Sequence, residues 1–264
     1  MSPAGTPAPI ASPAAPLVVG ETFTIDSRVL AETRRINVYA PPPYADSANI
    51  RLPVLYMPDG GIKEDFLHVA GLVEVLVGDG IMRPFLLVGI ENTERRRDLT
   101  GPTDNPNDRK IAPHVGGSAA FRRFIRTELM PEVNRRYRTT DETAIVGESL
   151  AGLFVVETLL LEPDLFDAYI AFDPSLWWND HKLVDEAGAL LRARPGLQKT
   201  LYFASSDEPG IVAETEPLAK ILEQDAPPGL HWHYERMPAE HHWTIYHPAA
   251  LRAFRAVFAP AAKQ

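Results

Sequence analysis

Five short, continuously apolar segments alternate along this chain with longer segments whose apolar residues recur at helical spacing. The apolar segments are PVLYM (53–57), PFLLVGI (84–90), TAIVGE (143–148), AYIAFD (168–173) and TLYFAS (200–205). A strand that is apolar on both faces is typical of a parallel sheet covered by helices. The helical segments between them cover residues 64–78, 118–137, 150–161 and 211–224. This alternation predicts an α/β fold in which a mostly parallel central sheet has helices on both faces.

The segments at either end complete this arrangement. Residues 21–27 and 34–41 alternate apolar and polar side chains, which predicts half-exposed antiparallel strands at one side of the sheet. We expect an eighth strand over 231–237 and a closing helix over 248–258. No repeat or linker divides the chain, so we expect a single domain over residues 20–260. Residues 1–19 are rich in Pro and Ala and predict a disordered leader.

Composition excludes several classes of function. The chain has no cysteine, which rules out disulfides, thiolate nucleophiles and cysteine zinc sites. Its net charge of −9 would repel nucleic acids and anionic lipid surfaces. No segment approaches the roughly 18 apolar residues that a membrane helix needs. We therefore expect a small-molecule substrate and no nucleic acid, membrane, metal or cofactor, with a homodimer left open.

The leader bears on location. It lacks the basic start and long apolar stretch of a secretory signal. It can be what remains of an exported protein after its signal was replaced, or simply a disordered N-terminus. We favour a periplasmic or secreted location over a cytoplasmic one.

A candidate nucleophile stands between a buried strand and an amphipathic helix, in TAIVGESLAGL (143–153). A nucleophile elbow needs a serine in a strained turn, with small residues two before and two after it. Ser149 has Gly147 and Ala151 in these positions. The related pattern around Ser118 follows a polar loop instead of a strand, so we interpret Ser118 as a helix N-cap.

The α/β-hydrolase order of nucleophile, acid and base directs the search for partners of Ser149. Among the late histidines, His231 and His233 fall inside the predicted eighth strand, where packing explains them. The loop PAEHHWTIYHP (238–248) is the expected place for the base, although spacing does not choose between His241 and His242.

Candidates for the acid and for the oxyanion hole follow from their positions at the ends of predicted strands. Asp207 or Glu208, at the end of the strand over 200–205, could orient the imidazole. Backbone N–H groups of Gly60 and Gly61, together with that of Leu150, are expected to stabilise an oxyanion.

With these residues in hand, the chain resembles the putative esterase family that includes esterase D and the enterochelin esterase-like hydrolases. The matching segments are PVLYMPDGG, FRRFIRTELMPEVNRRYRT, IVGESLAGLF, PDLFDAYIAFDPSLWW and EHHWTIYHPAAL. The resemblance implies the α/β-hydrolase fold and a base in a Glu-x-His pattern, which is His242 here. It also implies that Trp177 and Trp178 wall the active-site cleft. The family commonly has Ser where this chain has Asp173.

These observations predict ester hydrolysis through an acyl-enzyme, on siderophore-type or feruloyl esters. Arg97, in the run over residues 95–98, is a candidate for binding an anionic or catechol-bearing substrate. An acyltransferase and a non-catalytic binding protein of this fold are the alternatives. A metal hydrolase built from the late histidines lacks a supporting helix motif.

Overall fold

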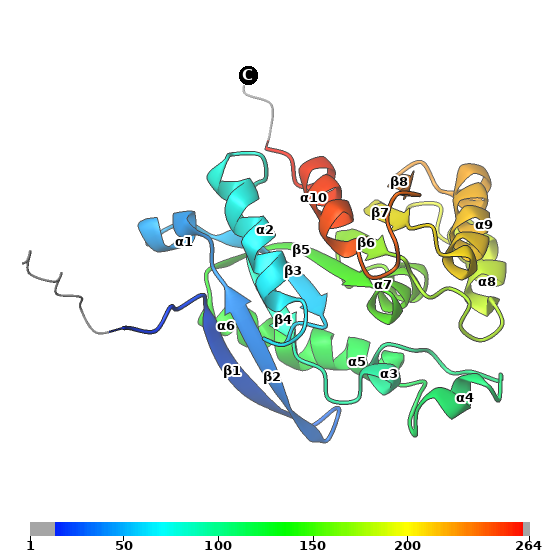
Figure 1. The fold of residues 1–264 in the computed structure, drawn as a ribbon, viewed down its shortest axis with the longest axis horizontal. Coiled ribbons are helices and arrows are strands. Elements are labelled where there is room, and N and C mark those ends of the chain that lie inside the picture. Colours follow the sequence, from blue (N-terminus) through cyan, green and yellow to red (C-terminus); the bar gives the residue numbers. More distant parts are fainter. Residues whose placement is uncertain (1–13, 261–264) are drawn as a thin grey trace, which may run out of the picture.

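The computed structural model describes residues 14–260, in which one eight-stranded sheet runs through the molecule (Figure 1). The strand order is β1-β2-β4-β3-β5-β6-β7-β8. Strand β2 pairs antiparallel with both β1 and β4, and the other pairs are parallel. This confirms the predicted sheet with its two antiparallel strands at one side. The strands are β1 (Glu21–Ser27), β2 (Glu32–Tyr39), β3 (Leu52–Pro58), β4 (Leu86–Ile90), β5 (Thr139–Glu148), β6 (Ala168–Phe172), β7 (Lys199–Ser205) and β8 (Leu230–Arg236).

Helices cover both faces of this sheet (Figure 1). On one face, α2 (Phe66–Gly78) and α10 (Tyr246–Val257) pack against each other and on the central strands. On the other face lie α5 (Ser118–Phe124), α7 (Leu150–Leu161), α8 (Lys182–Arg192) and α9 (Pro209–Asp225). The short helices are α1 (Pro42–Asp46), α3 (Arg95–Asp98) and α4 (Asp108–Ile111).

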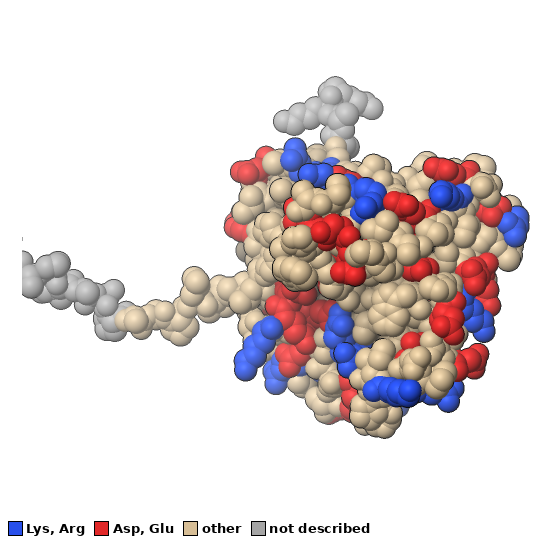
Figure 2. Space-filling model, turned by 45° about the vertical axis from the view of Figure 1, so that its right-hand side comes forward, with Lys and Arg blue, Asp and Glu red and all other residues tan. Residues whose placement is uncertain are grey.

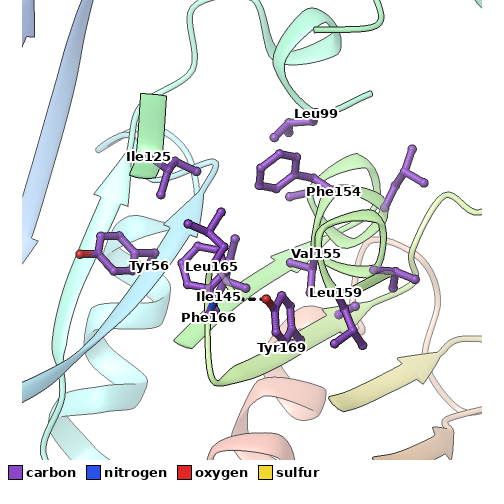
Figure 3. Close-up of a cluster of buried hydrophobic side chains, with 14 of the residues drawn as sticks. Tyr56, Leu99, Ile125, Ile145, Phe154, Val155, Leu159, Leu165, Phe166 and Tyr169 are labelled. Atoms are coloured by element: carbon purple, nitrogen blue, oxygen red, sulfur yellow. Dashed lines mark hydrogen bonds between the residues drawn. The ribbon is translucent and has the colours of Figure 1, made fainter. Parts of the chain in front are cut away.

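The burial of the central strands explains their sequences. Every residue of β3, β4 and β6 is buried, because helices cover these strands on both sides. Figure 3 shows part of the resulting core, to which β5 contributes Ile145 and α7 contributes Phe154 and Val155. Tyr169 satisfies its hydroxyl in this core by donating to the Pro163 carbonyl at 3.0 Å.

Two helical segments differ from the prediction. The segment over 118–137 is divided into α5, a π-helical turn η1 (Ile125–Leu129) and α6 (Met130–Arg136). Pro131 follows this turn, and it cannot donate the backbone hydrogen bond that a continuous α-helix would use there. The sequence analysis missed α8, although Leu183, Val184 and Ala187 have helical spacing.

The surface and the ends add three observations. Acidic and basic side chains are intermixed on the face in Figure 2. Within residues 14–260, no helix is both long enough and apolar enough to cross a membrane. Of the predicted leader, residues 14–19 are exposed and have no regular secondary structure, and residues 1–13 lie outside the described part.

Candidate active site

Ser149 lies at the sharp turn between β5 and α7. Its φ of 59° and ψ of −118° are strained for a residue with a side chain, as a nucleophile elbow requires. A Cβ atom on Gly147 would lie 2.7 Å from the backbone of Ala151, and one on Gly152 would lie 2.9 Å from the Phe172 carbonyl oxygen. Small residues therefore allow α7 to approach the sheet closely behind Ser149.

His242 approaches Ser149 from the loop between β8 and α10. Its Nε2 atom lies 3.1 Å from Ser149 Oγ, and its Nδ1 atom lies 2.9 Å from Asp173 Oδ2. The neighbouring His241 instead places Nδ1 2.8 Å from Asp207 Oδ2. The structure therefore brings His242, and not His241, to the serine.

Asp173, which follows β6 directly, is the carboxylate that contacts His242. It is fully buried, with a φ of 42°. The backbone N–H and the hydroxyl of Ser206 each donate to it at 2.6 Å. These two donors and the histidine fix the orientation of the Asp173 carboxylate.

The expectation that Asp207 or Glu208 orients the imidazole is wrong. Asp207 pairs with His241, and Glu208 is the N-cap residue of α9, where the chain leaves the strand end. The residue after β7 that contacts the site is Ser206, whose hydroxyl donates a hydrogen bond to Asp173. Glu208 acts on His242 through its charge alone.

The contacts of His242 assign its protons. An ionised carboxylate only accepts hydrogen bonds, so Nδ1–H donates to Asp173 and the lone pair of Nε2 faces the Ser149 hydroxyl. The hydrogen bond with Asp173 raises the pKa of His242, against the opposing effect of burial. This arrangement can accept a proton from Ser149 and stabilise the imidazolium that forms.

Glu148, the last residue of β5, is a second carboxylate at the site. Its Oε1 atom lies 3.5 Å from His242 Nε2, and 17% of its side chain is exposed. Burial raises the pKa of Glu148 to about 7, although the charges of His242 and Arg95 favour its ionised form.

Among the described residues, one group of three could offer ligand atoms to a metal ion: Glu148, Asp173 and His242. These atoms lie within 4.8 Å of one another. Both ring nitrogens of His242 already face protein partners, so the geometry fits proton transfer along the histidine better than coordination.

The three backbone N–H groups expected to bind an oxyanion differ in their hydrogen-bond partners. The N–H of Leu150 lies in the first turn of α7, where backbone N–H groups lack helical partners. The N–H of Gly60 donates to the Ile90 carbonyl at 3.0 Å, and that of Gly61 donates to Glu64 Oε2 at 2.6 Å. Of the three, only Leu150 keeps its amide clear of these contacts, because the loop after β3 uses the other two to hold its own shape.

Ser175 is a residue of the site that the sequence analysis missed. Its hydroxyl lies 3.4 Å from Ser149 Oγ, and its backbone N–H donates to the Ser149 carbonyl at 3.0 Å. The only signal for it was its place in the DPSLWW stretch, two residues after Asp173.

The expected substrate-binding side chains are largely used in packing. Trp178 is buried and donates its Nε1–H to the Gly101 carbonyl at 2.9 Å, while Trp177 is half-buried beside it. The guanidinium of Arg97 is held by Glu32 at 2.8 Å and by Asp98 at 2.7 Å. These ion pairs make Arg97 part of the scaffold and not a free anion-binding group.

Two further features lie around the loop after β3. Arg95 forms a two-pronged ion pair with Asp59, at 2.6 and 2.8 Å, and its charge acts on Glu148. A cleft of about 750 Å³ opens against this loop, and its lining includes Gly61 and Glu64.

The chain therefore has the α/β-hydrolase fold and a serine-centred site at one edge of its sheet. The chain belongs to the family described as "Putative esterase", whose model matches residues 27–257. The structure of an IroE-like serine hydrolase from Shewanella oneidensis is similar, with a TM-score of 0.80 and 29% identity over 90% of this chain and 80% of that one.

Two curated relatives are also similar over part of the chain. The ferri-bacillibactin esterase BesA of Bacillus subtilis is 34% identical over 166 residues, which are 56% of this chain and 56% of that protein. The siderophore triacetylfusarinine C esterase of Aspergillus fumigatus is 32% identical over 54% of this chain and 51% of that protein. The matches therefore span about half the length of these relatives.

Proposed function

We propose that this protein hydrolyses carboxylic esters through an acyl-enzyme on Ser149. The observation that carries the proposal is the continuous chain of contacts from Ser149 Oγ to His242 Nε2 at 3.1 Å and from His242 Nδ1 to Asp173 at 2.9 Å. Nucleophile, base and acid follow three different elements of the sheet, and their contacts match their chemical roles.

In the proposed mechanism, Ser149 attacks the ester carbonyl while His242 takes its proton. Asp173 stabilises the imidazolium, and the Leu150 N–H, supported by the positive end of the α7 dipole, stabilises the oxyanion. His242 then returns the proton to the leaving alcohol, which leaves Ser149 acylated. A water molecule attacks the acyl-enzyme with the same base, which releases the acid and restores the serine.

For the substrate, we propose an ester-linked siderophore. Support comes from the two curated relatives, of which one is named a ferri-bacillibactin esterase and the other a siderophore triacetylfusarinine C esterase. A cleft of about 750 Å³ also opens against the loop after β3, but its lining includes none of Ser149, Asp173 and His242, so the proposed substrate class rests on the relatives.

The test combines labelling with a substrate panel. The purified full chain is treated with a fluorophosphonate and assayed on p-nitrophenyl esters, a feruloyl ester, and enterobactin with and without iron, with products identified by mass spectrometry. Ser149→Ala is expected to lose both labelling and hydrolysis, because only an activated hydroxyl forms the adduct. Ser118→Ala is the matched control, since the Ser118 hydroxyl donates to Glu157 at 2.5 Å as the first residue of α5.

The outcomes separate activity from substrate class. Labelling that persists in Ser149→Ala would contradict the assignment of the nucleophile. Hydrolysis of p-nitrophenyl or feruloyl esters without cleavage of enterobactin would support an esterase and argue against this siderophore.

A further inference from the structure

Glu148 has a position that the proposed mechanism leaves unused. It precedes Ser149 directly, and its Oε1 atom lies 3.5 Å from the His242 nitrogen that must receive the serine proton. Asp173 contacts the other nitrogen of the same ring. The imidazole therefore lies between two carboxylates, one at each nitrogen.

We propose that Glu148 is a positioning residue for His242, which holds the protonated ring toward Ser149 and sets the pH range of activity. This inference rests on the proposed ester hydrolysis. It assigns Glu148 a role at Nε2 that complements the role of Asp173 at Nδ1.

The contacts of Glu148 favour such a role over a purely structural one. Within residues 14–260, its carboxylate accepts no hydrogen bond from another side chain, although most of that side chain is buried. The carboxylate keeps some contact with solvent but, among the described residues, has no protein donor that replaces the water lost through partial burial. Ionised Glu148 can gain a donor when His242 carries a proton on Nε2, which is the state formed as Ser149 attacks.

The charges around the pair agree with this role. When Glu148 is ionised, it opposes the loss of the proton from His242, as Asp173 does. Because the two groups lie so close, their titrations are coupled and the active form appears only after the pair has lost its last dissociable proton. The charged and titratable groups that face Glu148 or His242 from the surrounding elements are Asp59 after β3, Arg95 of α3, Asp173 after β6, Glu208 before α9 and Tyr246 of α10.

The experiment is the pH dependence of kcat/KM for p-nitrophenyl acetate in the full chain, in E148Q and in E148D. Glutamine keeps the shape of Glu148 and removes its charge. The midpoint of the rise in activity is expected to fall by about half to one pH unit in E148Q, since a charge at this distance no longer holds the proton on His242. E148D keeps the charge and is expected to have a midpoint between the other two.

Asp207→Asn is the matched control. It also removes one carboxylate from the neighbouring loop, but Asp207 contacts His241 instead of His242. If turnover of E148Q is too slow, the pH dependence of fluorophosphonate labelling gives the same midpoint. An unchanged or higher midpoint in E148Q, or an equal decrease in Asp207→Asn, would overturn the proposal. A wild-type chain that cleaves no ester would instead refute the proposed function.

Discussion

Replacing Asp173 by Asn is expected to abolish most of the activity while leaving the fold intact. The backbone N–H of Ser206 donates to Asp173 Oδ1, and this donor cannot turn away. The asparagine carbonyl must therefore remain at that oxygen, which places the side-chain NH₂ group at the Oδ2 position beside His242 Nδ1. A donor there forces Nδ1 to become the acceptor, so the ring proton moves to Nε2.

The size of the effect follows from this change of tautomer. With a proton on Nε2, His242 cannot accept the proton of Ser149, although both side chains remain in place. The equivalent replacement in a measured triad lowers turnover by about four decades. We expect about three to four decades in kcat, which corresponds to about 4 to 5.5 kcal/mol in the activation free energy.

The assay is hydrolysis of p-nitrophenyl acetate, with circular dichroism and thermal unfolding as checks on the fold. Asp207→Asn and Glu208→Gln are the matched controls, and each is expected to change kcat by less than about tenfold, because neither side chain contacts His242. Near-normal activity in Asp173→Asn, or a loss of three decades in either control, would refute the reasoning.

Three further predictions concern the surroundings of Ser149. Loss of the base in His242→Ala should lower kcat/KM by several orders of magnitude. Wild-type activity should rise with pH through a midpoint above the ordinary histidine pKa of about 6.5, because the pKa of His242 is raised, and His241→Ala should keep that pH profile. Glu148→Gln should be more stable than wild type at pH 8 and similar to it at pH 4. The reason is that the pKa of Glu148 is raised from 4.5 to about 7 in the folded state, so the wild-type protein loses stability as pH rises through 7. Urea titration at pH 8 should show a gain in unfolding free energy of at most about 3 kcal/mol in the variant. Gly147→Ala should lower the unfolding free energy by roughly 1 to 3 kcal/mol and slow fluorophosphonate labelling, because the added methyl group meets backbone atoms of Ala151. Unchanged stability would contradict the close packing of the elbow.

The parts of the fold that could be predicted are those set by burial alone. Strands covered on both faces must be apolar throughout, so β3, β4 and β6 were recognisable as short apolar runs. The turn at Ser149 could be predicted because the strand before it and the helix after it were both recognisable, and small residues stand two before and two after the serine. The choice of His242 over His241 needed the family resemblance, since consecutive loop residues differ only in the direction of their side chains.

The acid could not be predicted from position because parallel strands end at the same edge of the sheet. The sequence analysis considered only Asp207 and Glu208 after β7, whereas Asp173 directly after β6 lies at the same edge, and the contacts of the side chains decide between them. The available signal was chemical: the family commonly has Ser where this chain has Asp173. The prediction that Arg97 binds substrate failed for a similar reason. Neighbouring arginines in α3 point in different directions, so Arg97 pairs with Glu32 and Arg95 pairs with Asp59.

Strain at three strand ends explains how one edge of this sheet becomes a site. Asp59, Ser149 and Asp173 follow β3, β5 and β6 directly, and each has a positive φ, of 56°, 59° and 42°. Such conformations cost about 1 to 3 kcal/mol each and persist only where the surrounding structure fixes them. The backbone continues to pair beyond these strands, since the N–H groups of Ser149 and Asp173 donate to the carbonyls of Phe172 and Ala204 at 3.0 and 2.9 Å. The sheet therefore holds Ser149 and Asp173 in strained turns that direct their side chains toward His242. Burial of the core below offsets the free-energy cost of these strained turns.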